Sequence, residues 1–348
     1  TMADSTDETG QMPLVALVGP TATGKTSLAV ALAERLRDIT SCAAVAADSR
    51  QIYRLMDIAT AKPTPTERAA LPHALIDVVW PDESYTLAQY QADAQAAIAA
   101  STGDGALPLL IGGTGLYVRA VVDGLAIPTV APQPALRAEL EAEVATQGAT
   151  ALHQRLATLD PTAAAQIAPT NVRRVIRALE VCLVTGRPFS EQQGARPTPY
   201  RTLLLGLNME RAALYARADT RIDGMLAAGV VEETAGLVAR GYDWRLPSMS
   251  SLGYREIGAY LRGESSLAEA VERFKLATHR YIRRQLTWFR PDTRITWLDA
   301  TLPLATLAAQ AEALVRGWMA GSPLPQTSSP IPLSSRGEGG PEPPNVVR

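Results

Sequence analysis

Residues 19–26 read Gly-Pro-Thr-Ala-Thr-Gly-Lys-Thr and fit the phosphate-binding pattern Gly-x-x-x-x-Gly-Lys-Ser/Thr. An apolar run precedes the pattern and a helix-forming segment follows it, which is the context that such a loop needs. Its glycines let successive backbone N–H groups face one centre, and the helix start adds partial positive charge. Lys25 supplies a full charge, and the Thr26 hydroxyl suits Mg²⁺. We therefore expect a phosphate chain to be bound by Gly19, Pro20, Thr21, Ala22, Thr23, Gly24, Lys25 and Thr26. The alternative is a glycine-rich turn without a ligand.

The loop pattern does not identify the molecule to which the bound phosphate chain belongs. Enzymes that hydrolyse nucleotides with such a loop usually hold Mg²⁺ with an aspartate at the end of an apolar strand. Asp48 and Asp77 are the candidates here. The apolar run 107–111 instead ends in Gly112-Gly113-Thr114, and no arginine-rich lid is evident. The residues alone leave open whether the ligand is ATP or another diphosphate.

Short apolar runs alternate with helix-forming segments in the first third of the chain. The runs fall at 14–18, 43–47, 75–79 and 107–111, and the helical segments at 25–37, 86–100 and 114–122. Further strand-like runs at 201–207 and 294–298 accompany helical stretches at 210–240 and 266–289. This alternation predicts an α/β fold with a parallel sheet flanked by helices. Because ligands of open α/β sheets bind at the carboxyl edge of the strands, we expect Asp48 to emerge at the site.

An interruption divides the predicted core. Residues 127–134 are rich in Pro and Ala, and the helix-forming segments 134–146, 150–159 and 171–185 follow without a strand. We interpret 127–199 as an inserted all-helical subdomain, with 12–126 and 200–321 forming the core. Residues 1–11 are polar and acidic, 322–348 are rich in Pro, Ser and Gly, and both are predicted to be disordered tails.

Composition narrows the class of protein. Apolar residues make up 47% of the 348, enough for a sizeable core, whereas the net charge of −2 means that nucleic-acid binding must rely on local basic clusters. Cys42 and Cys182 are too far apart for a metal or redox motif, which favours a reducing, cytoplasmic compartment. No apolar run reaches the length of a membrane span, so no membrane association is expected.

Further segments complete an ordered pattern. They are Asp48–Arg54, Met56–Pro63, Pro72-His73, Leu75–Asp77, Gly112–Tyr117, Arg174 with Arg177–Val181, Thr185-Gly186, Gly253-Tyr254 and Arg284–Trp288. Together with the phosphate loop, this set resembles the bacterial tRNA dimethylallyltransferase family from about residue 13 to residue 298. The resemblance implies a P-loop kinase-like fold in which the loop holds the leaving diphosphate.

The resemblance also implies a reaction. A dimethylallyl group passes from dimethylallyl diphosphate to N6 of the adenosine 3′ to the tRNA anticodon, with Mg²⁺ as cofactor. The implied catalytic set is Lys25, Asp48 as general base, Thr114 near the amine and diphosphate, and Arg221 against the diphosphate. From the residues alone, Asp48 could also be a Mg²⁺ ligand or a helix N-cap, Thr114 a helix N-terminal hydroxyl, and Arg221 part of a solvated helix face.

Contacts with tRNA are implied by the same resemblance. The positions are Asp48, Ser49, Arg50, Gln51, Thr114, Arg137, Arg173, Arg174, Val175, Ile176, Arg177, Arg284 and Gln285. The Gln51 amide suits an adenine edge. Residues 171–201 hold six arginines against two glutamates, a local charge of +4, and 273–294 hold seven basic residues against one aspartate, a local +6. Such runs suit contact with phosphates, although a solvated helix face is the usual meaning of any single run.

Three other functions use some of the same features. An enzyme that prenylates free AMP or ATP needs the loop and the base but no basic helical insertion. A small-molecule kinase consumes ATP, and a non-catalytic tRNA-binding module needs neither an intact loop nor Asp48. We expect a monomer that binds tRNA and dimethylallyl diphosphate.

Overall fold

The computed structural model describes residues 10–322, and these form two compact units. The first contains residues 10–122 and 199–322, and the second contains residues 123–198. The predicted tails at 1–11 and 322–348 lie almost wholly outside the described residues. Within 10–322, none of the helices combines the length and the apolar character that crossing a bilayer requires.

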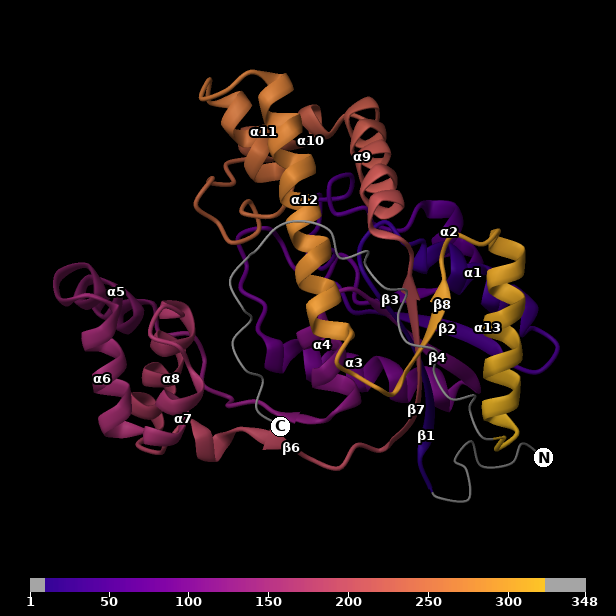
Figure 1. Cartoon of the computed structure of the whole chain (residues 1–348), viewed down its shortest axis with the longest axis horizontal. Coiled ribbons are helices and arrows are strands. Elements are labelled where there is room, and N and C mark those ends of the chain that lie inside the picture. The colour runs from indigo at the N-terminus through magenta and orange to yellow at the C-terminus, as the bar shows by residue number, and fades with distance from the viewer. Residues whose placement is uncertain (1–9, 323–348) are drawn as a thin grey trace. The chain divides into compact units, whose positions relative to one another are not determined.

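A six-stranded parallel sheet organises the first unit (Figure 1). Its strands are β1 (Met12–Val18), β2 (Ser41–Ala46), β3 (His73–Ala74), β4 (Ala106–Gly112), β7 (Tyr200–Asn208) and β8 (Ile295–Asp299). They lie in the order β3-β2-β4-β1-β7-β8. In register, Val18 lies beside Gly112 of β4 on one side and Gly206 of β7 on the other. The loop that follows β1 therefore emerges at the centre of the carboxyl edge.

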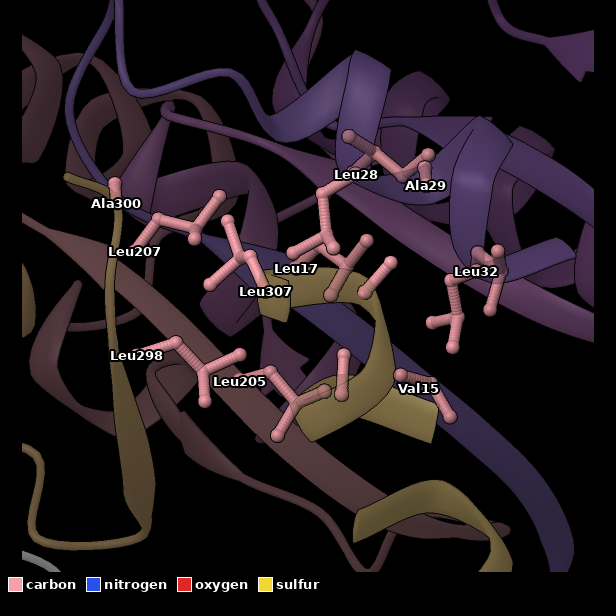
Figure 2. Close-up of a cluster of buried hydrophobic side chains, with 14 of the residues drawn as sticks. Val15, Leu17, Leu28, Ala29, Leu32, Leu205, Leu207, Leu298, Ala300 and Leu307 are labelled. Carbon is pink, nitrogen blue, oxygen red and sulfur yellow. The ribbon is translucent and has the colours of Figure 1, made fainter. Parts of the chain in front are cut away.

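Helices make up most of the rest of the first unit. They are α1 (Lys25–Arg35), α2 (Pro65–Ala70), α3 (Leu87–Gly103), α4 (Gly115–Val122), α9 (Arg211–Ala227), α10 (Val230–Ala239), α11 (Tyr254–Leu261), α12 (Leu267–Phe289) and α13 (Leu304–Met319). Some of them cover the two faces of the sheet, whereas α10 and α11 belong to a separate apolar cluster. On one face, α1 and α13 lie side by side (Figure 1). Figure 2 shows their leucines packed against the alternate residues Leu205 and Leu207 of β7. Side chains of α3, α4 and the end of α12 bury the other face.

Residues 123–198 form a helical unit. Its elements are β5 (Leu125–Ala126), α5 (Pro134–Gln147), α6 (Ala149–Leu159), α7 (Pro161–Gln166), α8 (Val172–Thr185), the 3₁₀ turn η1 (Ser190–Gln192) and β6 (Gly194–Ala195). The helices enclose an apolar core of their own. Strands β5 and β6 pair antiparallel where the chain enters and leaves the unit, so it is not wholly helical as predicted. Gly124, with φ +57°, permits this closure because a Cβ would lie 2.5 Å from the carbonyl oxygen of Arg196.

The α/β fold class is confirmed, and several element boundaries differ from the prediction. The run 75–79 is not a strand: Leu75 and Asp77 have positive φ, and β3 ends before them. The stretch 210–240 is two helices, because Gly229 turns the chain with φ +94°. Helices α2, α7, α11 and α13 were not predicted. For α13 the signal was present, since Leu307, Ala311 and Val315 recur at helical spacing and are buried.

Candidate active site

The phosphate loop links β1 to α1 in the conformation that its glycines predict. Gly19 has φ +135° and lies where a Cβ would come within 2.5 Å of the Leu207 carbonyl oxygen. Gly24 has φ +88°, directly before the first residue of α1. The buried Thr23 hydroxyl donates to the carbonyl oxygen of Pro20 at 2.9 Å and closes the loop on itself. The loop therefore has the fold of an anion cradle at a helix N-terminus.

Lys25 is the charged centre of this loop. Its Nζ donates to the carbonyl oxygens of Gly19 at 3.0 Å and Pro20 at 2.7 Å. Burial lowers the pKa of Lys25 to about 7; the Asp48 carboxylate opposes this shift, and the Arg221 guanidinium adds to it. A bound polyanion stabilises the ammonium form. The Lys25 ammonium group is thus held by two carbonyl oxygens of the loop itself, and burial disfavours its charge.

Arg221 of α9 reaches the same loop from the other side. Its Nη1 donates to the Thr21 hydroxyl at 3.4 Å, across 200 positions in sequence. Its side chain is exposed to solvent, yet the protein atoms around it lower its pKa; Asp48 opposes this shift, and the neighbouring Arg217 contributes to it. Arg217 itself approaches Gly24, since a Cβ there would be 3.1 Å from its Nη2. Two arginines of α9 therefore flank the loop.

Asp48 and Thr114 follow the two strands nearest to β1 on one side, and a network ties them together. The carboxylate of Asp48 accepts the backbone N–H of Arg50 at 2.9 Å. Thr114 Oγ1 accepts the backbone N–H of Ser49 at 3.1 Å, and the Thr114 N–H donates to the carbonyl oxygen of Ala47 at 3.2 Å. The loops after β2 and β4 are thereby joined beside the phosphate loop, so a carboxylate and a hydroxyl line the same edge as Lys25.

Tyr281 of α12 completes this edge and was not predicted. Its side chain lies near Thr114 and Asp48. Burial raises the pKa of Tyr281, the Asp48 carboxylate adds to the rise, and Thr114 opposes it. Arg284 lies over the same ring, with its Cζ 5.6 Å from the centroid. The only sequence signal was spacing, because Tyr281 lies one helical turn before Gln285 on the same helix.

Asp77, the other aspartate considered for Mg²⁺, is engaged elsewhere. Its carboxylate accepts from Lys62 at 2.5 Å and from Arg68 at 2.9 Å. Burial alone raises the pKa of Asp77, and the two cations outweigh that effect and lower it. Lys62 also donates to the carbonyl oxygen of Tyr53 at 2.6 Å. Asp77 therefore anchors the segment that follows Asp48, which leaves Asp48 as the carboxylate at the loop.

Three residues expected to contact tRNA have internal partners. Gln51 Nε2 donates to the carbonyl oxygens of Thr60 at 3.3 Å and Ala61 at 3.2 Å, so its donor is not presented for bidentate reading of adenine. Arg50 Nη1 donates to the carbonyl oxygen of Pro247 at 3.0 Å. Gln285 is only 4% exposed, and its amide joins two backbone groups of the active-site loops.

The residues of the helical unit that are expected to contact tRNA include both exposed and buried side chains. Arg173 and Arg174, at the start of α8, are exposed. Val175 and Ile176 are 0% and 5% exposed in the core of the unit, so their side chains offer no surface to tRNA. Arg137 pairs with Glu180 through two bonds of 2.7 Å, and that glutamate side chain is fully buried.

Arg177 is the second partner of Glu180. Its Nη1 donates to Glu180 at 2.6 Å, and its Nη2 donates to the Val130 carbonyl oxygen at 3.0 Å. Burial disfavours the charge of Glu180, but bonds from Arg137, the Gln133 N–H and Arg177 outweigh it and hold its pKa at about 2. Arg137 and Arg177 therefore hold a buried carboxylate, and their contact with tRNA stays a prediction.

The described residues limit how a metal can be bound. Across 10–322, no cluster of three or more His, Cys, Asp or Glu side chains is suited to a metal ion. Mg²⁺ needs only one or two protein oxygens where phosphates and water supply the others. Thr26, the second residue of α1, lies partly buried beside the loop and fits that requirement.

The fold and the site define a class, the P-loop α/β proteins, with a carboxylate and a hydroxyl facing the loop. A family model described as IPP transferase matches residues 51–292. The tRNA dimethylallyltransferase of Roseiflexus sp. strain RS-1 is 51% identical over 308 residues, which are 88% of this chain and 99% of that protein. The chain belongs to the IPP transferase family.

Two solved structures are similar to this chain. The full-length tRNA isopentenylpyrophosphate transferase from Bacillus halodurans has a TM-score of 0.66 and 40% identity, covering 89% of this chain and 97% of its own. A eukaryotic dimethylallyltransferase acting on tRNA has a TM-score of 0.76 and 25% identity, covering 90% of this chain and 81% of its own. The similarity spans both units of the fold.

Proposed function

We propose that this protein transfers a dimethylallyl group from dimethylallyl diphosphate to N6 of the adenosine 3′ to the anticodon in tRNA. One observation carries the proposal: the Asp48 carboxylate interacts with Lys25 and Arg221 at a phosphate loop, so a base and a diphosphate cradle share one site. Family membership supplies the prenyl donor and the tRNA acceptor.

The diphosphate end of the substrate is the leaving group. As the bond between the allylic carbon and the bridging oxygen breaks, its electron pair moves onto the diphosphate. The N–H groups of the loop, Lys25 and Arg221 stabilise that charge as it develops. Lys25 leaves the carbonyl oxygens of Gly19 and Pro20 to do so. Mg²⁺, held by Thr26 and the phosphates, supplies further charge neutralisation when bound.

The acceptor end requires proton removal. The N6 lone pair forms the new bond to carbon, and one N6 proton passes to a carboxylate oxygen of Asp48. Thr114 lies between Asp48 and the phosphate loop in the network described above, and its hydroxyl orients the amine. The adenosine must leave its stack to reach this edge. The products are N6-dimethylallyladenosine in tRNA, diphosphate and a proton.

Recognition of tRNA is proposed to involve the helical unit. Arg173 and Arg174 are exposed at the N-terminus of α8, where helix charge adds to theirs. Arg284, exposed on α12, supplies a contact near the acceptor. We further propose that the protein is cytoplasmic, in keeping with the buried free thiols of Cys42 and Cys182, and that it acts as a monomer.

A direct test distinguishes this reaction from the other uses of a phosphate loop. The protein is incubated with radiolabelled dimethylallyl diphosphate and, separately, unmodified tRNA, AMP or ATP. Label in tRNA alone, located at the adenosine 3′ to the anticodon after nuclease digestion, is the expected result. Label in AMP or ATP assigns adenylate prenylation, and consumption of ATP with no label transfer assigns a kinase.

A further inference from the structure

Gln285 joins two loops of the active site from a buried position on α12. Its Oε1 accepts the backbone N–H of Thr21 at 2.9 Å, and its Nε2 donates to the carbonyl oxygen of Gly113 at 2.9 Å. These partners are 264 and 172 positions away in sequence. Both functions of one amide are therefore used, one on the phosphate loop after β1 and one on the loop after β4.

Each partner is directly linked to a residue of the proposed chemistry. The Thr21 hydroxyl accepts Arg221 at 3.4 Å, on the leaving-group side. Gly113 precedes Thr114, whose hydroxyl accepts the Ser49 N–H at 3.1 Å next to Asp48, on the acceptor side. The Gln285 amide thus joins the loop that is proposed to hold the diphosphate to the loop that carries Thr114, beside the proposed base Asp48.

Glycines in the loop after β4 allow α12 to pack closely against that loop. A Cβ on Gly113 would overlap the Gln285 amide and would lie 3.1 Å from the Gly19 carbonyl oxygen. A Cβ on Gly115 would lie 3.0 Å from the Trp288 ring, on the next turn of α12. The Gly-Gly-Thr-Gly segment is therefore packed against α12 at two points, and Gln285 is the one that reaches across to the phosphate loop.

We propose that Gln285 is a positioning residue that fixes the separation between the diphosphate loop and the acceptor-side loop. This inference rests on the proposed function, because its consequence is the alignment of the allylic carbon with N6. Misplacement of reacting groups by about 1 Å costs roughly 100-fold in rate. An amide is required, since one atom must accept from Thr21 and another must donate to Gly113.

The test compares two substitutions with a matched control on the same helix. Gln285→Met keeps the length and removes both bonds; Gln285→Glu keeps the shape but, as a carboxylate, cannot donate to Gly113. Thr278→Val alters another buried polar side chain of α12, whose hydroxyl has no partner among the described residues. We expect kcat to fall about 100-fold in both Gln285 variants, with KM for tRNA little changed, and Thr278→Val to resemble the unaltered protein.

Other outcomes of this experiment distinguish failure of the inference about Gln285 from failure of the proposed function. A lower Tm with unchanged kcat makes Gln285 merely structural, and a raised KM for tRNA with unchanged kcat makes it a tRNA contact; either result overturns the inference. Absence of transfer by the unaltered protein overturns the proposed function instead. Hydrogen exchange of residues 19–24 then tests the link alone: it is expected to be faster in Gln285→Met than in Thr278→Val, and equal exchange overturns the inference.

Discussion

Basic side chains have different hydrogen-bond acceptors at the carboxyl edge of the sheet and in the helical unit. At the edge, Lys25 bonds to two carbonyl oxygens and Arg221 to a hydroxyl, all of them neutral acceptors. In the helical unit, Arg137 and Arg177 share the carboxylate of the buried Glu180. The first pair is hydrogen-bonded only to neutral acceptors, whereas the second pair shares one buried carboxylate.

This difference shows how an arginine-rich segment should be interpreted. A buried carboxylate costs several kcal/mol unless it is paired and hydrogen-bonded, so Glu180 commits two arginines to structure. Arg173 and Arg174, a few positions away on α8, remain exposed. Local charge therefore predicts that a surface is basic, and the position of the acidic partner decides which side chains form it.

The largest expected effect is at the acceptor end of the edge site. Asp48→Asn keeps the shape of the side chain and removes its basicity, so the rate is expected to fall by roughly 10²- to 10⁴-fold while both substrates still bind. Single-turnover transfer of label to tRNA measures this. Substantial recovery of the rate at raised Mg²⁺ would identify Asp48 as a metal ligand instead.

Glu180 provides the contrasting test in the helical unit. Glu180→Ala leaves Arg137 and Arg177 without their buried partner, and we expect a loss of about 3 kcal/mol from the stability of this unit. Since all five tryptophans lie outside 123–198, their fluorescence reports the first unit and serves as control. Hydrogen exchange in α8 reports the second unit, and unchanged protection there would contradict the structural role.

Acid should have a related effect on the same unit. The pKa of Glu180 is about 2 in the folded protein, below the ordinary glutamate value of 4.5. The stability that its charge supplies is therefore present above about pH 4.5 and is lost as the pH falls toward 2. Faster exchange of α8 over that range in the unaltered protein, but not in Glu180→Ala, is the expected result.

The titration of Lys25 provides a test of the proposed phosphate site at the sheet edge. Because its pKa is about 7 without a ligand, the ammonium form that binds diphosphate is depleted as the pH rises above 7. Affinity for inorganic diphosphate, relative to that of Lys25→Arg, is expected to fall up to about tenfold per pH unit. Arginine stays charged and so cancels the titration of the ligand itself. Parallel pH profiles in calorimetry would contradict this.

The smallest expected effect concerns two arginines of α8. Arg174→Ala is expected to weaken tRNA binding a few-fold and to reduce its salt slope by about one, without loss of stability. Arg177→Ala, three positions further along α8, is expected instead to destabilise the unit through Glu180. Filter binding at several salt concentrations and hydrogen exchange measure the two effects, and identical behaviour of the variants would remove the distinction.

Local patterns made the phosphate site predictable from the sequence. The conformation of 19–26 depends on glycines within the loop and on the strand and helix that flank it, all contiguous in sequence. The alternation of apolar runs with helical segments likewise predicted the parallel sheet, because burial on both faces requires it. Asp48 could be expected at the carboxyl edge for the same reason.

Only the tertiary structure decided which side chains meet. Gln285 reaches Thr21 across 264 positions, and Glu180 reaches Arg137 across 43. Neither contact leaves a periodic signal, because the partners of a long-range bond depend on how separate elements pack. Thus the sequence by itself determined an α/β protein with a glycine-rich loop between β1 and α1 and predicted a carboxylate at the same edge of the sheet. Packing decided that Gln285 joins two active-site loops and that Arg137 and Arg177 stabilise a buried glutamate, because burial removes water as an alternative partner.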